Sequence, residues 1–186
     1  MPRLLRLVWL VLVVFLHGAP LAAQTYEFTT IGGRATFYGA DDGPAATASF
    51  AARALAIDGQ GTIFLVSSGT NTIRKIAPDG LVSTLAGAPY ERGNVDGIGT
   101  AARFNSPSGI AVDASGTLYV ADTGNGTLRR ITSDGRVTTL RNNTAGAYLA
   151  FPSAMMLDSS GHLLVVDNGA LQKVSPDGDI TMLLSN

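Results

Sequence analysis

The stretch Asp122-Thr-Gly-Asn125 places a carboxylate and a carboxamide three residues apart. Side-chain oxygens of this kind can bind a ligand or a calcium ion. The same residue types also hydrogen-bond to the backbone of their own turn, and this structural role is the one we favour. Asp122 and Asn125 are therefore candidate ligand contacts whose alternative role is to hold a turn.

Further polar residues lie in positions that the repeats described below bring to the same face. These candidate ligand-face residues are Asp96, Asn71, Asp167 and Asn168. The polar loops of this face are the best place for a ligand, because loops carry most binding residues. The ligand that we expect is a protein, a peptide or a glycan.

Most catalytic and metal chemistry is excluded by composition. Cysteine is absent, so a disulfide, a thiolate metal site or a cysteine nucleophile cannot form. His162 is the one histidine after residue 23, which excludes a zinc site built from histidines and leaves serines such as Ser106, Ser108 and Ser153 without a triad partner. We expect no catalytic residue, no metal and no cofactor.

The first 23 residues read as a signal peptide. Arg3 and Arg6 precede an apolar run over residues 7–16, and small residues lead to Ala23. Ten apolar residues are fewer than the roughly 20 that a membrane span needs. We therefore expect a secreted or periplasmic protein without a membrane anchor.

The charge of the remaining chain argues against nucleic acid as a partner. Residues 1–23 hold two of the 13 basic residues and none of the 14 acidic ones, so 11 basic and 14 acidic residues remain, a net charge of −3. A basic patch, which nucleic-acid binding requires, is missing.

Three internal repeats organise the rest of the chain. They begin at Phe50, Phe104 and Phe151, and each carries an aspartate, then a glycine, then an Asp-Gly pair. The turn residues shared by the repeats are expected to be structural: Asp58, Gly61, Asp113, Gly116, Asp158, Gly161, Asp134 and Gly135.

Each repeat predicts four short strands, called A to D. In the second repeat they cover residues 109–112, 117–121, 127–131 and 137–140, with turn residues between them. Four antiparallel strands in 40–50 residues are typical of a β-propeller blade. Strand A is mostly apolar, which predicts an inner strand packed on both faces. The A–B and C–D turns then share one face of the propeller, and the B–C turns and D–A linkers share the other.

The second repeat resembles an NHL repeat. The resemblance rests on Pro107-Ser-Gly-Ile-Ala-Val-Asp113, Leu118-Tyr-Val-Ala-Asp122-Thr-Gly-Asn125 and Arg129-Arg-Ile131, although Gly126 stands where the family name implies a histidine. The other two repeats match more weakly. The resemblance implies a β-propeller, usually of about six blades, and usually a platform that binds other molecules.

The predicted blades do not make a complete ring. The expected divisions are a signal peptide over 1–23, an outer strand and linker over 24–49, and blades over 50–103, 104–150 and 151–186. Residues 28–31 resemble a spare strand D, and three blades are too few to close. A truncated longer propeller is the explanation we favour; a ring completed by another copy and an open array with covered edges are the alternatives.

The sequence therefore predicts an all-β, exported, non-catalytic binding module. A second hypothesis is one part of a metal-dependent lactonase- or lyase-like propeller whose ligands lie on missing blades. A third is a purely structural spacer.

Overall fold

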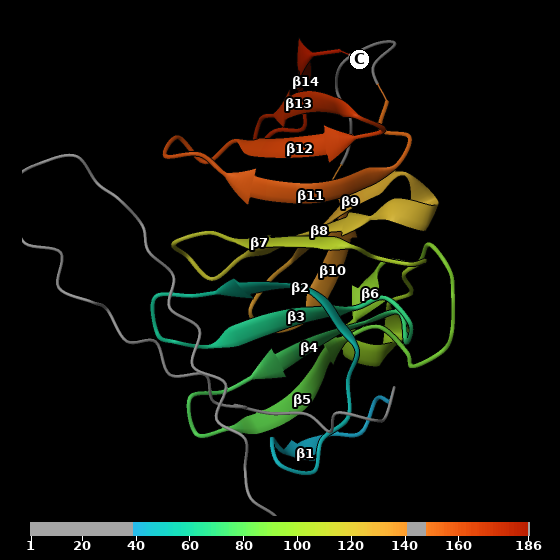
Figure 1. The fold of residues 1–186 in the computed structure, drawn as a ribbon, viewed down its shortest axis with the longest axis vertical. Coiled ribbons are helices and arrows are strands. Elements are labelled where there is room, and N and C mark those ends of the chain that lie inside the picture. Colours follow the sequence, from blue (N-terminus) through green and yellow to red (C-terminus); the bar gives the residue numbers. More distant parts are fainter. Residues whose placement is uncertain (1–38, 141–147, 186) are drawn as a thin grey trace, which may run out of the picture. The chain divides into compact units, whose positions relative to one another are not determined.

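The computed structural model describes residues 39–140 and 148–185 and contains three antiparallel sheets (Figure 1). Blade 1 has the strand order β1-β5-β4-β3-β2, blade 2 the order β6-β10-β9-β8-β7, and blade 3 the order β11-β12-β13-β14. No sheet in the described part of the chain closes on itself. The predicted signal peptide and the spare strand over residues 28–31 lie outside the described residues.

The strands have the following bounds. Blade 1 consists of β1 (Gly43–Pro44), β2 (Ala52–Ile57), β3 (Ile63–Ser67), β4 (Thr72–Ile76) and β5 (Leu81–Ala86). Blade 2 consists of β6 (Gly97–Ile98), β7 (Gly109–Val112), β8 (Leu118–Asp122), β9 (Thr127–Ile131) and β10 (Arg136–Thr139). Blade 3 consists of β11 (Pro152–Leu157), β12 (Leu163–Asp167), β13 (Ala170–Val174) and β14 (Ile180–Leu184). The turns η1 (Gly99–Ala101) and η2 (Thr123–Asn125) are short 3₁₀ helices.

The four predicted strands of the second repeat are confirmed, two of them with a shift of one residue. Strand B ends at Asp122 rather than one residue earlier, and strand D covers Arg136–Thr139. The linkers also form two strands that the sequence did not predict. Gly43 and Gly97 lie beside Val82 and Val137, so each linker adds a short fifth strand to the outer edge of the blade that follows it.

The blades are held together by two apolar cores. One joins blades 1 and 2 through side chains such as Val66, Phe104 and Val120. The other joins blades 2 and 3 through residues that include Tyr119, Leu128 and Val165. Both cores follow from the two-residue period of the strands, since alternate side chains of blade 2 point to opposite neighbours.

The inner strands of the three blades lie side by side, with β7 between β2 and β11 (Figure 1). As predicted, β7 is packed on both faces. The prediction is wrong for β2 and β11, because Leu55 of β2 is 60% exposed and Met156 of β11 is 59% exposed. Each of these two strands has a neighbouring blade on one side only, and the other side meets solvent.

Within residues 39–140 and 148–185, no helix is long and apolar enough to cross a membrane.

Candidate functional site

The repeated A–B turns are closed by their own aspartates. Asp113 accepts hydrogen bonds from the backbone N–H groups of Ser115 (2.9 Å) and Thr117 (2.8 Å). The corresponding bonds of Asp58 go to Gln60 and Thr62, and those of Asp158 go to Ser160 and His162. The glycines of the turns have positive φ angles, which glycine adopts without strain: Gly61 (83°), Gly116 (83°), Gly161 (80°) and, in the C–D turn after Asp134, Gly135 (80°).

Asp122 is fully buried at the end of β8. Its carboxylate accepts hydrogen bonds from the backbone N–H of Asn105 (2.8 Å), from Nδ2 of Asn125 (2.7 Å) and from Nη1 of Arg129 (2.9 Å). Burial raises the pKa of Asp122, and the three hydrogen bonds and the Arg129 charge oppose that rise. In the described part of the chain, the Asp122 carboxylate is therefore bound by groups of the protein itself.

Arg129 connects Asp122 to the linker that enters blade 2. Its guanidinium donates to the backbone oxygens of Arg103 and Val95, both at 3.0 Å, and to Oδ1 of Asp96 at 2.7 Å. It also lies over the ring of Phe104, 5.2 Å from the centroid. Such a buried arginine organises irregular backbone because it offers five donors in a fixed plane.

Asp96 and Asn125 serve the same network. Asp96 also accepts a bond from Oγ1 of Thr139 (2.9 Å), and about half of its side chain is exposed. Asn125 donates to the backbone oxygen of Gly93 at 2.8 Å. Both residues thus tie the linker to blade 2, and each leaves part of its side chain at the surface.

Blade 1 contains part of the same network one repeat earlier, with Ser67 in the position of Asp122. Arg74 is fully buried and donates to Asp42 (2.6 Å) and to the backbone oxygens of Asp41 and Ser49. Asp42 accepts a bond from Thr84, as Asp96 does from Thr139. Sequence reasoning missed this network. Its signal was the repeat spacing, which is 54 residues between Asp42 and Asp96 and 55 residues between Arg74 and Arg129.

Blade 3 keeps the aspartate of the network but not the arginine. Asp167 is buried and accepts bonds from the backbone N–H groups of Ala150 (3.0 Å) and Phe151 (2.6 Å) and from Nε2 of Gln172 (3.0 Å). Gln172 thus occupies the position of Arg129. The carboxylate still holds the chain where it enters the inner strand.

The last two ligand-face candidates differ in exposure. Asn71 is buried, has a φ of 57°, and accepts a hydrogen bond at its Oδ1 from the backbone N–H of Ser106 (2.9 Å), so it links blade 1 to the segment that enters blade 2. Asn168 is exposed, with a φ of 47°. The sequence-derived candidates therefore lie along one face, but only Asp96, Asn125 and Asn168 retain exposed or partly exposed side chains.

The inner strands line a hollow of about 470 Å³, here called the axial hollow. Its lining consists of repeat-equivalent segments, residues 53–55, 108–110 and 153–155. Arg53, Ser108 and Ser153 occupy the same position in the three repeats, at the end of the hollow nearest the B–C turns. Arg53 is exposed and has no hydrogen-bond or ion-pair partner within the described residues.

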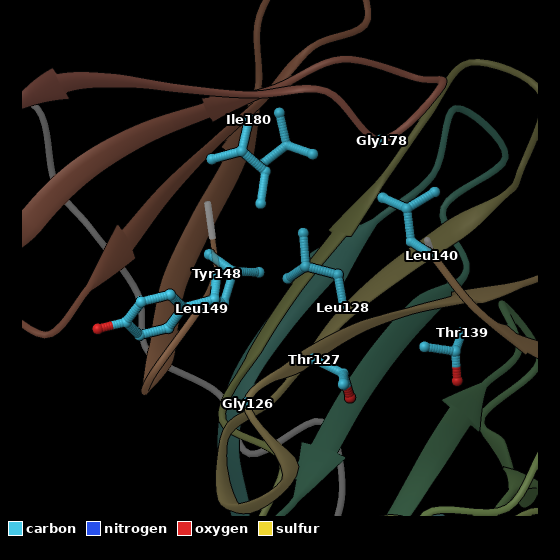
Figure 2. Close-up of a pocket in the computed structure, with 10 residues that line it drawn as sticks. Gly126, Thr127, Leu128, Thr139, Leu140, Tyr148, Leu149, Gly178 and Ile180 are labelled. Carbon is cyan, nitrogen blue, oxygen red and sulfur yellow. The ribbon is translucent and has the colours of Figure 1, made fainter. Parts of the chain in front are cut away.

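A second hollow of about 520 Å³ lies between the outer parts of blades 2 and 3 (Figure 2). Apolar side chains dominate it, among them Leu128, Leu149 and Ile180. Leu140 and Tyr148 also line it, and they flank residues 141–147, which the structure does not describe. We therefore assign no ligand to this hollow.

Acidic and histidine side chains do not gather anywhere in the described ranges into a group of three or more that could hold a metal ion. The buried carboxylates of Asp122 and Asp167 instead accept hydrogen bonds from backbone, amide and guanidinium donors.

A protein-family profile described as "NHL repeat" matches residues 104–131, which run from the first residue of the second repeat to the end of strand β9. This segment of the chain matches the NHL repeat. The matched segment holds Asp122, Asn125 and Arg129 of the blade-2 network, whereas Asp96 and Thr139 lie outside it.

Curated proteins similar to this chain include teneurin-3 of Danio rerio, which is 36% identical over 96 residues, and teneurin-4 of Homo sapiens, which is 36% identical over 94 residues. Each match covers 43% of this chain. The matched region spans only 4% and 3% of those proteins.

Solved structures share the fold. A gluconolactonase from Xanthomonas campestris superposes with a TM-score of 0.58 and 18% identity, over 73% of this chain and 48% of that one. An auxiliary nutrient binding protein from Bacteroides thetaiotaomicron gives 0.56 and 19%, over 69% and 36%. A virginiamycin B lyase from Staphylococcus aureus gives 0.53 and 21%, over 70% and 40%. At these identities the likeness establishes β-propeller architecture alone.

Proposed function

We propose that this NHL-repeat chain is an exported, non-catalytic module that binds a protein, peptide or glycan at the end of the axial hollow nearest the B–C turns. The observation that carries the proposal is the convergence of Arg53, Ser108 and Ser153, one from each blade, on that hollow. Arg53, which has no partner among residues 39–140 and 148–185, is available for an acidic group of the ligand.

The neighbouring hydroxyls support a polar ligand. Oγ of Ser153 donates to the backbone oxygen of Val166 (3.1 Å), and Oγ of Ser108 lies 2.5 Å from Oγ1 of Thr123. A hydroxyl has two acceptor lone pairs besides its donor, so each serine keeps capacity for a further hydrogen bond. The exposed parts of Asn125 and Asn168 would extend the contact area on the same face.

Export is part of the same proposal. It rests on the predicted signal peptide over residues 1–23 and is consistent with a similar solved structure whose name is that of a nutrient binding protein.

The binding test uses a panel of acidic and neutral synthetic peptides and oligosaccharides. We expect acidic members to bind, and Arg53→Ala to weaken binding about tenfold, because a charge-assisted hydrogen bond contributes roughly 1.5 kcal/mol or more. Arg136→Ala is the matched control, since Arg136 is exposed on β10 and lies outside the hollow. Equal binding by Arg53→Ala and the parent chain would contradict this site.

A second candidate is part of a metal-dependent lactonase- or lyase-like enzyme. The observation in its favour is that a gluconolactonase and a virginiamycin B lyase share the fold. Stabilisation of the chain by Ca²⁺, Mg²⁺ or Zn²⁺ that Asp122→Asn or Asp167→Asn abolishes would support it. Unchanged melting temperatures with each ion would favour the binding module.

A further inference from the structure

We propose that the free face of blade 3 binds the free face of blade 1 of a second copy, so that two chains complete each other head to tail. The leading face is the side of blade 1 that carries Leu55 and Ile57, which are 60% and 56% exposed. Ile63 and Leu65 lie on the same side, where Leu65 is already buried with Ala48 and Ile63 is partly buried. The trailing face is the side of blade 3 that carries Met156, Leu164, Val166 and Leu171. The proposal concerns assembly and goes beyond the binding function above.

The leading face repeats a surface that is already an interface. The blade 2 equivalents of Leu55, Ile57, Ile63 and Leu65 are Ile110, Val112, Leu118 and Val120, all of which pack in the core against blade 1. Leu55 is 60% exposed, whereas Ile110 is 5% exposed. Ala48 and Phe50 already lie on the leading face, as Ala102 and Phe104 lie in the core between blades 1 and 2. The leading face therefore has the side chains that contact a neighbouring blade elsewhere in the chain.

The trailing face repeats the opposite side of the same interface. The blade 2 equivalents of Met156, Leu164, Val166 and Leu171 are Ala111, Tyr119, Ala121 and Leu128, which form the core against blade 3. Met156 is 59% exposed, whereas Ala111 is 7% exposed. Equivalent apolar side chains are buried between blades in one repeat and exposed to solvent in another. This difference indicates that a further blade is the missing partner.

A polar contact between blades points to the same pairing. The hydroxyl of Ser68 donates to the backbone oxygen of Pro107 in the next blade, and the hydroxyl of Thr123 donates to that of Pro152 (2.7 Å). Asn168 follows the strand B aspartate as Thr123 does, and Ala52 has the position of Pro107 and Pro152. The exposed carboxamide of Asn168 is therefore placed to donate to the backbone oxygen of Ala52 in a second copy.

The second copy is the occupant because this chain carries both halves of the interface. A head-to-tail contact uses different surfaces on the two partners, and it forms a closed ring when the rotation between copies permits. The matched regions correspond to 48% of the Xanthomonas gluconolactonase, 40% of the virginiamycin B lyase and 36% of the nutrient binding protein, so two copies would supply most of a propeller of that size. Two copies would also cover both open faces at once.

Cross-linking tests the contact on a cysteine-free background, since the natural chain has none. The full chain with Ala52→Cys and Asn168→Cys is treated with a short bis-maleimide and analysed on a denaturing gel. We expect a covalent dimer from the double variant and not from either single variant. Ser133→Cys with Asn168→Cys is the control, because Ser133 lies in a C–D turn on the opposite face.

A second variant separates assembly from folding. We expect Val166→Asp to leave the circular dichroism spectrum unchanged and to lower the dimer yield at least tenfold. Ile98→Asp, at a site that is also apolar and half-exposed but lies on the outer edge of blade 2, should leave the yield unchanged. Absence of the cross-linked dimer from a folded chain overturns the proposal in favour of further blades on a longer chain. Cross-linked species larger than a dimer overturn the two-copy closure.

Discussion

At the scale of single residues, the polar side chains of Asp122 and Asn125 mainly bond within the protein. Asp122, the first residue of the stretch that could have bound a ligand, is fully buried and neutralised by Arg129, while Asn125 hydrogen-bonds to both the carboxylate and the linker. The guanidinium and the carboxylate need each other, because an isolated charge at this depth would be strongly unfavourable.

The first prediction concerns this buried pair. Asp122→Asn should lower the free energy of unfolding by about 3 kcal/mol, because it leaves the charge of Arg129 buried with one carboxylate fewer. Asp96→Asn should cost roughly 1 kcal/mol or less, since the Asp96 side chain is half exposed. Urea unfolding of both variants measures the difference, and equal losses would contradict the proposed central role of Asp122.

The second prediction concerns pH. Hydrogen bonds from the backbone of His162 and the side chain of Lys173 hold the pKa of Asp158 well below its ordinary value near 3.8. A lowered folded-state pKa means that the stabilisation is present above about pH 4 and is lost as the pH falls through the folded value. Asp158→Asn should therefore reduce the melting temperature at about pH 6 and have a much smaller effect at about pH 2. A deficit that stays constant across this range would contradict the linkage.

The roles of the turn residues were predictable from sequence, whereas the arginine network was not. An aspartate followed three residues later by glycine closes a local turn, and the hydrogen bonds of Asp113 require no knowledge of the rest of the fold. The partners of Arg129 lie up to 34 residues away, and pairing at that distance depends on how the linker folds back. The burial of Asn71 was not predictable for the same reason, because it depends on the contact with Ser106 in the next repeat.

At the scale of elements, the four strands of each blade follow from alternation and turn chemistry, and the fifth strands do not. Residues 43–44 and 97–98 hold glycine, proline and isoleucine without a strand pattern. They become strands because the arginine networks hold the linkers against β5 and β10. Tertiary contacts thus decide what local propensity leaves open.

The third prediction concerns the approach of two inner strands. A Cβ added at Gly109 of β7 would lie 1.9 Å from the backbone oxygen of Ser153 at the start of β11. Gly109→Ala should therefore push the blades apart and destabilise the protein by about 3 kcal/mol or more. Gly59→Ala is the matched control, because a Cβ there has no atom within 4 Å. Thermal unfolding should show a large loss for the first variant and a small change for the second; similar losses would contradict the close packing of β7 and β11.

At the scale of the whole molecule, the described blades end in two open faces that repeat the buried cores between them. The sequence predicted this incompleteness from the number of repeats, but only the structure shows which side chains it exposes, among them Leu55 and Met156. A second copy would cover both faces. Arg53, Ser108 and Ser153 of both copies would then lie around one hollow. Assembly and ligand binding would then depend on the same inner strands.

Head-to-tail pairing is best tested by the mass of the purified full chain in solution, measured by light scattering over a concentration series. Head-to-tail pairing of two copies predicts a folded, β-rich species with twice the mass of the single chain, which falls to the single-chain mass on dilution or in Val166→Asp. A folded species that stays at the single-chain mass at every concentration would contradict it.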